Sequence, residues 1–173
     1  GTLSNGTDTT EIWDIERVDL GSGDDTIILG GGSATVDSGD GGDRFIVGDG
    51  FVSSTLDGNF GYDVIDLTGL SDGVTIVFDG PNSGTITSNA AGGGTITFAG
   101  IEQIIATNFD DVIDATLDDG TTFIETRSGD DSLTGSDAGG VYDDFANDPN
   151  GQGNDTFTGG AGDDTLWMGT DDD

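Results

Sequence analysis

The sequence predicts an all-β solenoid in which two nine-residue units make one turn, and three observations support this. A nine-residue period runs through residues 20–75 and 106–173, with an apolar residue at the eighth position of each unit. A core of the form G-x-G-x-D-x-U, with U large and apolar, is complete in the units that begin at Gly21, Gly39, Gly151 and Gly160. The pattern of residues 15–27 returns in residues 101–113, which indicates an internal duplication.

Each element follows from this pattern. Residues 1–19 are an N-terminal flank ending in a leading strand, and blocks 20–75 and 106–173 carry the repeats. Within a unit, small residues allow a tight turn, and the short strand after it points its apolar residue inward. In the first block these inward residues are Ile27, Val36, Phe45, Leu56, Ile65 and Val74. Residues 76–105 break the period, and their alternating polar and apolar residues predict antiparallel strands or larger, irregular solenoid turns.

Charge limits the possible partners. The chain has 35 acidic residues, a formal net charge of −32 and three basic residues, Arg17, Arg44 and Arg127. Such self-repulsion destabilises a compact state unless something neutralises it. No basic patch for nucleic acid can be built, and no apolar run reaches membrane-spanning length, so neither nucleic-acid binding nor membrane insertion is expected. The chain has no Cys, and a metal can replace disulfides as the stabilising cross-link.

The aspartates at the sixth position of the repeats are the candidate metal ligands. Because two units make a turn, aspartates of alternate units stack along one edge, about one strand spacing apart. Two carboxylates and the turn carbonyls then suit calcium, which takes oxygen ligands. In the first block one edge carries Asp25, Asp43 and Asp63, and the other carries Ala34, Ser54 and Asp72. In the second block one edge carries Asp111, Asp131, Asp155 and Asp173, and the other carries Thr122, Gly140 and Asp164.

The best sites are predicted between Asp25 and Asp43, between Asp43 and Asp63, and between Asp111 and Asp131. Pairs Asp131–Asp155 and Asp155–Asp173 are further candidates, the former weakened by a six-residue insertion. The turn glycines assigned to these sites are Gly21, Gly23, Gly39, Gly41, Gly151, Gly153, Gly160 and Gly162. The alternative is Asx-turn chemistry without metal. The preceding aspartates are expected to face solvent as surface charge: Asp24, Asp110, Asp130 and Asp163.

The unit at residues 159–167 reads G-G-x-G-x-D-x-U-x, and the repeats resemble the RTX, or hemolysin-type calcium-binding, family. This resemblance implies a right-handed parallel β-roll or β-helix solenoid, in two imperfect halves with an irregular β spacer between them. It also implies several bound Ca²⁺ ions, type I secretion, and folding outside the cell when calcium binds. The expected location is therefore secreted, extracellular or at the cell surface. Several units depart from the family pattern because they lack the aspartate, and the frame slips by two residues in both halves.

The expected function is that of a calcium-binding structural and secretion-folding module, and not an enzyme. The chain has no His, Cys or Lys, which removes imidazole bases, thiol nucleophiles and Schiff bases. Among 35 acidic residues, no carboxylate pair stands in a distinctive glycosidase motif. Asp148-Pro149 is interpreted as a turn, with self-cleavage as the alternative. Because the chain stops inside a repeat, we expect it to be part of a longer protein.

Three rival functions remain open. The chain could be part of a calcium-dependent secreted enzyme. It could also be an adhesive or surface-layer module that binds glycan or neighbouring copies, with four aromatic residues either stacking on sugar or packing in the core: Trp13, Phe51, Phe60 and Trp167. Halophilic surface acidity without a specific metal would explain the charge but not the repeat spacing.

Overall fold

The computed structural model describes residues 2–4, 9–11, 16–144 and 153–168. These residues form 18 β-strands and no helix. Accordingly, the described part of the chain contains no helix that is long and apolar enough to cross a membrane.

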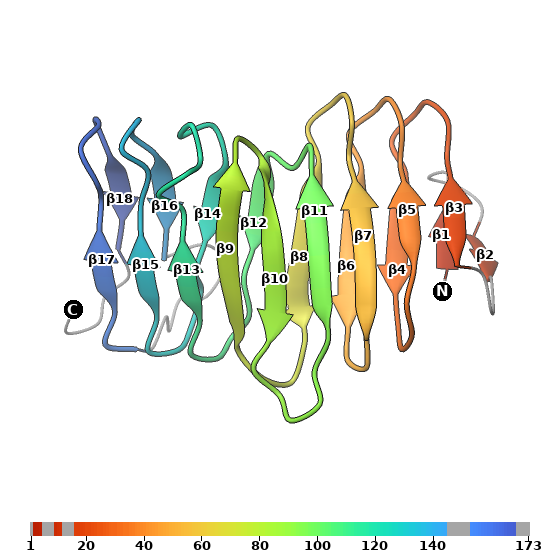
Figure 1. The fold of residues 1–173 in the computed structure, drawn as a ribbon, viewed down its shortest axis with the longest axis horizontal. Coiled ribbons are helices and arrows are strands. Elements are labelled where there is room, and N and C mark those ends of the chain that lie inside the picture. The colour runs from red at the N-terminus through yellow and green to blue at the C-terminus, as the bar shows by residue number, and fades with distance from the viewer. Residues whose placement is uncertain (1, 5–8, 12–15, 145–152, 169–173) are drawn as a thin grey trace.

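The strands form two nine-stranded sheets that face each other (Figure 1). In order from the C-terminal end of the solenoid, sheet A contains β18 (Thr165–Trp167), β16 (Val141–Asp143), β14 (Phe123–Glu125), β12 (Gln103–Ile105), β8 (Val64–Gly69), β6 (Arg44–Gly48), β4 (Thr26–Leu29), β1 (Thr2–Ser4) and β2 (Thr9–Glu11). In the same direction, sheet B contains β17 (Thr156–Thr158), β15 (Ser132–Thr134), β13 (Val112–Asp114), β9 (Val74–Gly80), β10 (Ser83–Ser88), β11 (Thr95–Ala99), β7 (Ser53–Asp57), β5 (Thr35–Asp37) and β3 (Arg17–Asp19).

Parallel pairing between successive coils confirms the predicted parallel β-solenoid. Strand β4 pairs with β6 and β6 with β8 in sheet A, while β5 pairs with β7 in sheet B. All six apolar residues predicted to point inward in the first block are buried. Stacking these side chains in register between the two sheets gives one continuous apolar core, which a single nine-residue unit is too small to form.

The spacer is an antiparallel meander built into sheet B. Strand β10 pairs antiparallel with both β9 and β11. The outer two strands of this meander pair in parallel with the repeats, β9 with β13 and β11 with β7. Inside it, Phe78 and Phe98 pack edge to face with ring centroids 5.4 Å apart. The spacer therefore continues the solenoid, and the repeats on both sides share its core.

The N-terminal flank contributes a feature that its weak pattern did not predict. Strands β1 and β2 form an antiparallel pair, and β1 also pairs antiparallel with β4. This pair covers the edge of β4 in sheet A, where the unpaired backbone groups of a parallel strand would otherwise be open to pairing with another chain.

Candidate metal centre

The first acidic ladder consists of Asp25, Asp43, Asp63 and Glu102 in stacked turns at the start of sheet A strands. One carboxylate oxygen of each later member accepts a backbone N–H from the coil before it. The Asp25 N–H donates to Asp43 Oδ1 at 2.8 Å, and the Asp43 N–H donates to Asp63 Oδ1 at 2.8 Å. The Asp63 N–H donates to Glu102 Oε2, again at 2.8 Å. The predicted stacking of Asp25, Asp43 and Asp63 is therefore present.

The second acidic ladder consists of Asp111, Asp131 and Asp155 and repeats this geometry at the start of sheet B strands. The Val74 N–H donates to Asp111 Oδ1 at 2.7 Å. The Asp111 N–H donates to Asp131 Oδ1 at 2.8 Å, and the Asp131 N–H donates to Asp155 Oδ1 at 2.7 Å. Residues 131 and 155 are 24 apart in sequence, so the insertion between them does not break the stack.

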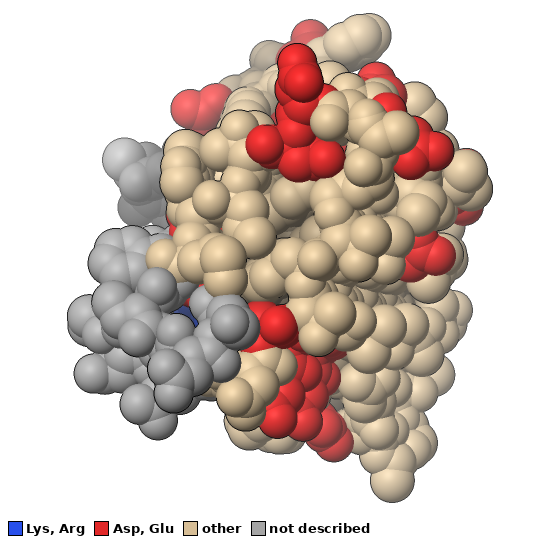
Figure 2. All heavy atoms as spheres, turned by 90° about the vertical axis from the view of Figure 1, so that its left-hand side faces the viewer, with Lys and Arg blue, Asp and Glu red and all other residues tan. Residues whose placement is uncertain are grey.

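The two ladders lie on opposite long edges of the solenoid. The first precedes β4, β6, β8 and β12 of sheet A, whereas the second precedes β13, β15 and β17 of sheet B. Chain direction alternates between the sheets, so the first ladder is on the upper edge in Figure 1 and the second on the lower edge. Figure 2, which views the C-terminal end, shows acidic side chains near both the top and the bottom. The two acidic ladders therefore lie in separate places on the solenoid.

Three ladder aspartates each have a buried carboxylate oxygen without a hydrogen-bond partner. Asp43, Asp63 and Asp131 are exposed by only 1%, 0% and 2%. Within the described residues, the Oδ2 atoms of these three side chains have no hydrogen-bond partner. Burying a charged oxygen without a partner is expensive, and the usual solutions are a bound cation or a bound proton. A carboxylate that binds a cation through its second oxygen would show this arrangement.

The pKa values show how unfavourable these charges are without a cation. Burial raises the pKa of Asp63 to about 7, with further repulsion from Asp43 and Glu102, against the lowering effect of the Asp43 N–H. Burial raises the pKa of Asp131 to about 8, and the carboxylates of Asp111 and Asp155 add to this rise. Near neutral pH each carboxyl therefore binds a proton readily unless a cation takes its place.

Asp111 differs because donors in its own turn form hydrogen bonds with both of its carboxylate oxygens. Its Oδ2 accepts the Thr107 N–H at 2.9 Å, and the Thr107 hydroxyl lies 3.0 Å and 3.1 Å from the two carboxylate oxygens. Burial still raises the pKa of Asp111, to about 6. Thr107 replaces the first glycine of the repeat, and its hydroxyl supplies a donor that glycine lacks. Among the residues that the structure describes, the buried carboxylate oxygens without a hydrogen-bond partner are those of Asp43, Asp63 and Asp131.

The repeat glycines allow backbone to stack directly on backbone at the first ladder. Gly39 has a φ of 95°, and an ideal Cβ on it would lie 1.9 Å from the carbonyl oxygen of Gly21. Gly41 has a φ of 142°, and its Cβ would lie 2.4 Å from the carbonyl oxygen of Gly23. These carbonyl oxygens belong to the turn that leads to Asp25, where turn carbonyls could serve as neutral ligands.

The other predicted site residues are three stacked glycines, two residues outside the described part of the chain, and Asp155. A Cβ on Gly153 would lie 1.9 Å from the Gly129 carbonyl oxygen, so Gly153 stacks on the preceding turn as Gly39 does. Gly160 and Gly162, in the turn before β18, are also tightly stacked on the coil before them. Gly151 and Asp173 lie outside the described residues. Asp155 is half-buried at the end of the second ladder.

Asp164 is exposed, and the residue at its position in the preceding coil is Gly140. In that coil the Tyr142 hydroxyl accepts the Ser136 N–H at 2.8 Å. A Cβ on Gly140 would lie 2.1 Å from the same hydroxyl, so the tyrosine fills the space that a carboxylate fills in the ladders. Although its sequence motif is the most complete, Asp164 therefore has no stacked carboxylate beneath it in the described part of the chain.

The aspartates one residue before the ladder positions do more than face solvent. Asp24, Asp110, Asp130 and Asp163 are exposed, as predicted. However, Asp24 Oδ1 accepts the Gly42 N–H at 2.9 Å, and Asp110 Oδ1 accepts the Asp130 N–H at 2.9 Å. Asp24, Asp110 and Asp130 are therefore surface charges that also link neighbouring turns.

Glu102 is the ladder member that the sequence prediction missed. It belongs to Ile101-Glu102-Gln103-Ile104, which resembles Ile15-Glu16-Arg17-Val18 and not the Gly-rich repeat. The available signal was its place just before a strand of sheet A, the same place that Asp25, Asp43 and Asp63 occupy.

The aromatic residues do not gather in one place. Phe51 is buried in the core, whereas Phe60 and Trp167 are 78% and 53% exposed. Phe60 lies in the turn before β8, and Trp167 lies on β18, with three strands of sheet A between them. Trp13 and Asp148-Pro149 are outside the described residues.

The ladders limit which metal can be held. No group of three or more His, Cys, Asp or Glu side chains is arranged for a metal within the described residues. A metal held at a ladder would therefore have two carboxylates and would take its remaining ligands from backbone carbonyls and water. Calcium accepts such a flexible set of oxygen ligands, whereas magnesium demands a near-ideal octahedron.

The buried carboxyls also predict how stability depends on pH in the presence of a chelator. The unfolded chain releases these protons near pH 4, but the folded chain holds those on Asp63 and Asp131 up to about pH 7 and 8. The folded state thus binds more protons across this window, so the free energy of unfolding should fall as pH rises from 5 to 8. Urea unfolding in chelator at both pH values measures this; greater stability at pH 8 would contradict it.

Comparison with known proteins gives no further identification: no family model, no curated protein and no solved structure matches this chain.

Proposed function

We propose that this chain is a calcium-binding solenoid module of a secreted protein, whose fold is completed when calcium neutralises the two acidic ladders. The observation that carries the proposal is the set of buried oxygens without partners on Asp43, Asp63 and Asp131. All three lie at sixth positions of the repeat, where the sequence predicts metal ligands. The resemblance of the repeats to the RTX family supports the same metal.

The energetics favour coupling between calcium and folding. A net charge of −32 opposes compaction, and the ladders bring carboxylates of successive coils close together. Because no such arrangement exists in an unfolded chain, the free energy of calcium binding becomes free energy of folding. Extracellular calcium modules have dissociation constants of about 10⁻⁴–10⁻³ M, which would leave the folded state marginally stable at low calcium and stable outside the cell. The module would act as a structural and secretion-folding element without catalysis.

Circular dichroism during a calcium titration tests this function. Starting from chelator at pH 7.5, we expect the β-sheet signal to rise with calcium at concentrations on the order of 0.1–1 mM. Equal magnesium should produce a much smaller change, because it dehydrates reluctantly and the ladders offer no rigid octahedral cage. A β-sheet signal and melting temperature that are the same in chelator and in calcium would refute the proposal.

A further inference from the structure

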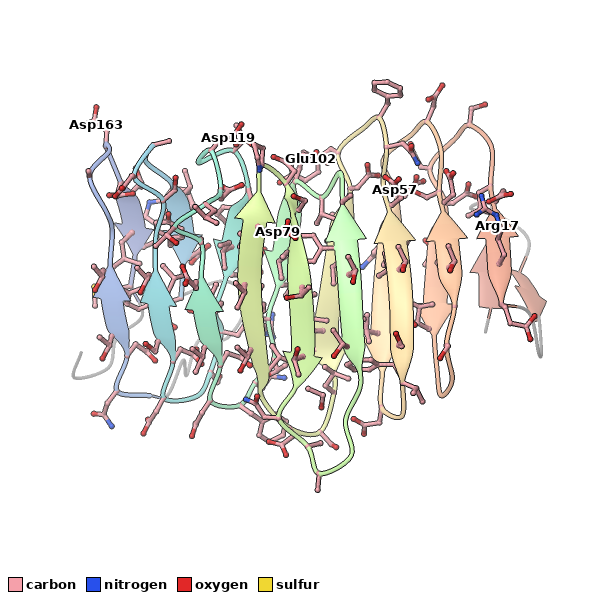
Figure 3. All side chains as sticks on the ribbon, in the orientation of Figure 1. Arg17, Asp57, Asp79, Glu102, Asp119 and Asp163 are labelled. Carbon is pink, nitrogen blue, oxygen red and sulfur yellow. The ribbon has the colours of Figure 1, made fainter. Side chains whose placement is uncertain are left out.

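We propose that the first ladder holds one more calcium ion than the repeat pattern predicts, at a site between Asp63 and Glu102. This inference rests on the proposed function, since it assigns a further site for the same ion. It differs from the predicted sites because one carboxylate comes from the segment before β12, outside the nine-residue repeats. Figure 3 shows Glu102 on the upper edge of the solenoid, the edge that carries the first ladder.

The buried oxygen of Asp63 marks one side of this site. Asp63 is fully buried, and its Oδ2 has no hydrogen-bond partner. The backbone of Gly58 packs closely beside it: an ideal Cβ on Gly58 would lie 2.6 Å from Asp63 Oδ2 and 2.1 Å from the carbonyl oxygen of Gly100. Because residue 58 has no side chain, Asp63 Oδ2 and the Gly100 carbonyl oxygen can both lie close to its Cα, and therefore close to each other.

The Glu102 carboxylate occupies the next position of the ladder and is held from two sides. Its Oε2 accepts the Asp63 N–H at 2.8 Å, and its Oε1 accepts the Asn82 side-chain amide at 2.8 Å. Asn82 is itself anchored, because its carbonyl oxygen accepts the Ile101 N–H at 3.1 Å and its Oδ1 accepts the Thr121 hydroxyl at 2.7 Å. Glu102 is thus fixed over Asp63 as Asp63 is fixed over Asp43.

The ladder ends at this site. In the next coil along the same edge the equivalent residue is Thr122, whose hydroxyl donates to Asp118 Oδ1 at 3.0 Å. Asp118 also accepts the backbone N–H groups of Gly120, at 2.9 Å, and of Asn82, at 3.2 Å. Neutral donors satisfy the Asp118 carboxylate, so this coil does not need a cation. Asn82 donates to both acids, with its side-chain amide to Glu102 and its backbone N–H to Asp118.

The donor set suits calcium. Two carboxylates from stacked turns and the Gly100 carbonyl oxygen are hard oxygen ligands, and water can complete the six to eight that calcium takes. Gly100 lies in the turn before Glu102 with a φ of 62°, so the turn that presents the carbonyl also positions the second carboxylate.

The test is the number of calcium ions bound to the whole chain by equilibrium dialysis, comparing the wild type with Glu102→Gln. Glutamine keeps the length of the side chain and an oxygen to accept the Asp63 N–H but removes the charge. We expect Glu102→Gln to bind one ion fewer. Asp79→Asn is the matched control: Asp79 is exposed near the end of β9, close to the turn that holds Asn82, and its loss removes one charge without touching the ladder. This control should bind the full number.

Each outcome decides between the proposals. If the wild type binds no calcium, the proposed function fails, and this inference fails with it. If the wild type and Glu102→Gln bind the same number of ions with equal affinity, only this inference fails. Glu102→Asp provides a second variant, which keeps the charge on a shorter side chain. It should keep the ion with affinity reduced several-fold, and unchanged affinity would count against the site.

Discussion

Replacing Asp43 with asparagine is expected to remove two calcium ions, because Asp43 belongs to a pair with Asp25 on one side and with Asp63 on the other. At calcium ten times the dissociation constant each lost ion lowers the free energy of unfolding by about 1.4 kcal/mol, so the total loss is about 3 kcal/mol. Equilibrium dialysis measures the ions, and urea unfolding in calcium measures the stability.

The same substitution should have the opposite effect in chelator. The buried Asp43 carboxylate has an oxygen with no partner and lies between two other acids, so a neutral amide of the same shape removes repulsion. Asp43→Asn is therefore expected to unfold at a higher urea concentration than the wild type without calcium, and at a lower one with it. Such a crossing separates a ligand from a residue that only supports the fold.

Asp40→Asn is the control for this pair of measurements. Asp40 is exposed three residues earlier in the same turn, and its replacement changes the net charge by the same amount. It should alter neither the number of bound ions nor the calcium dependence of unfolding by more than a few tenths of a kcal/mol, as is usual for surface substitutions. Equal behaviour of the two variants would show that overall charge, and not a site, controls stability.

The fold could be predicted because each unit carries its own signal. The apolar eighth residues, such as Phe45 and Ile65, mark one inward position per strand, and both are fully buried in register across β6 and β8. Once two units per turn are assumed, the stacking of Asp25, Asp43 and Asp63 follows. Local pattern and global packing agree here, so the sequence alone is sufficient.

The spacer could not be predicted in the same way, and it decides where the second ladder lies. Strands β9, β10 and β11 all stay in sheet B, so the chain crosses to sheet A only at β12, and the turn with Asp111 falls on the opposite edge from Asp25. Glu102 enters the first ladder through this same crossing. Neither result is visible without knowing which sheet β10 and β11 join.

Local side-chain chemistry also lies beyond the repeat pattern. Thr107 breaks the glycine pattern but supplies the hydroxyl that satisfies Asp111. Tyr142 fits the repeat pattern as the inward-pointing eighth residue of its unit. Its hydroxyl, however, fills the space above Gly140 that a carboxylate fills in the ladders. Whether a buried oxygen has a partner depends on contacts between coils, which residue spacing does not describe.

Gly39→Ala is expected to disrupt the fold with or without calcium, because it acts on the stacking of the turns and not on a ligand. The new Cβ would lie 1.9 Å from the Gly21 carbonyl oxygen, in a residue with a φ of 95°. The left-handed conformation alone costs about 1–2 kcal/mol. Asn59 and Arg127 adopt it at the equivalent position with φ of 62° and 75°, so the backbone clash must be the larger part of the effect.

Gly21→Ala is the matched control, because it is the same position of the repeat one coil earlier. An ideal Cβ on Gly21 meets no atom within 4 Å, and its φ is outside the left-handed region. We expect Gly39→Ala to lower the free energy of unfolding in calcium by more than 3 kcal/mol, roughly the range of severe single substitutions. Gly21→Ala should change it by less than about 1 kcal/mol. Unfolding of both variants at the wild-type urea concentration would contradict this prediction. It would mean that neighbouring turns do not need direct backbone contact. The turn carbonyl oxygens would then not be held close enough to the carboxylates to serve as ligands.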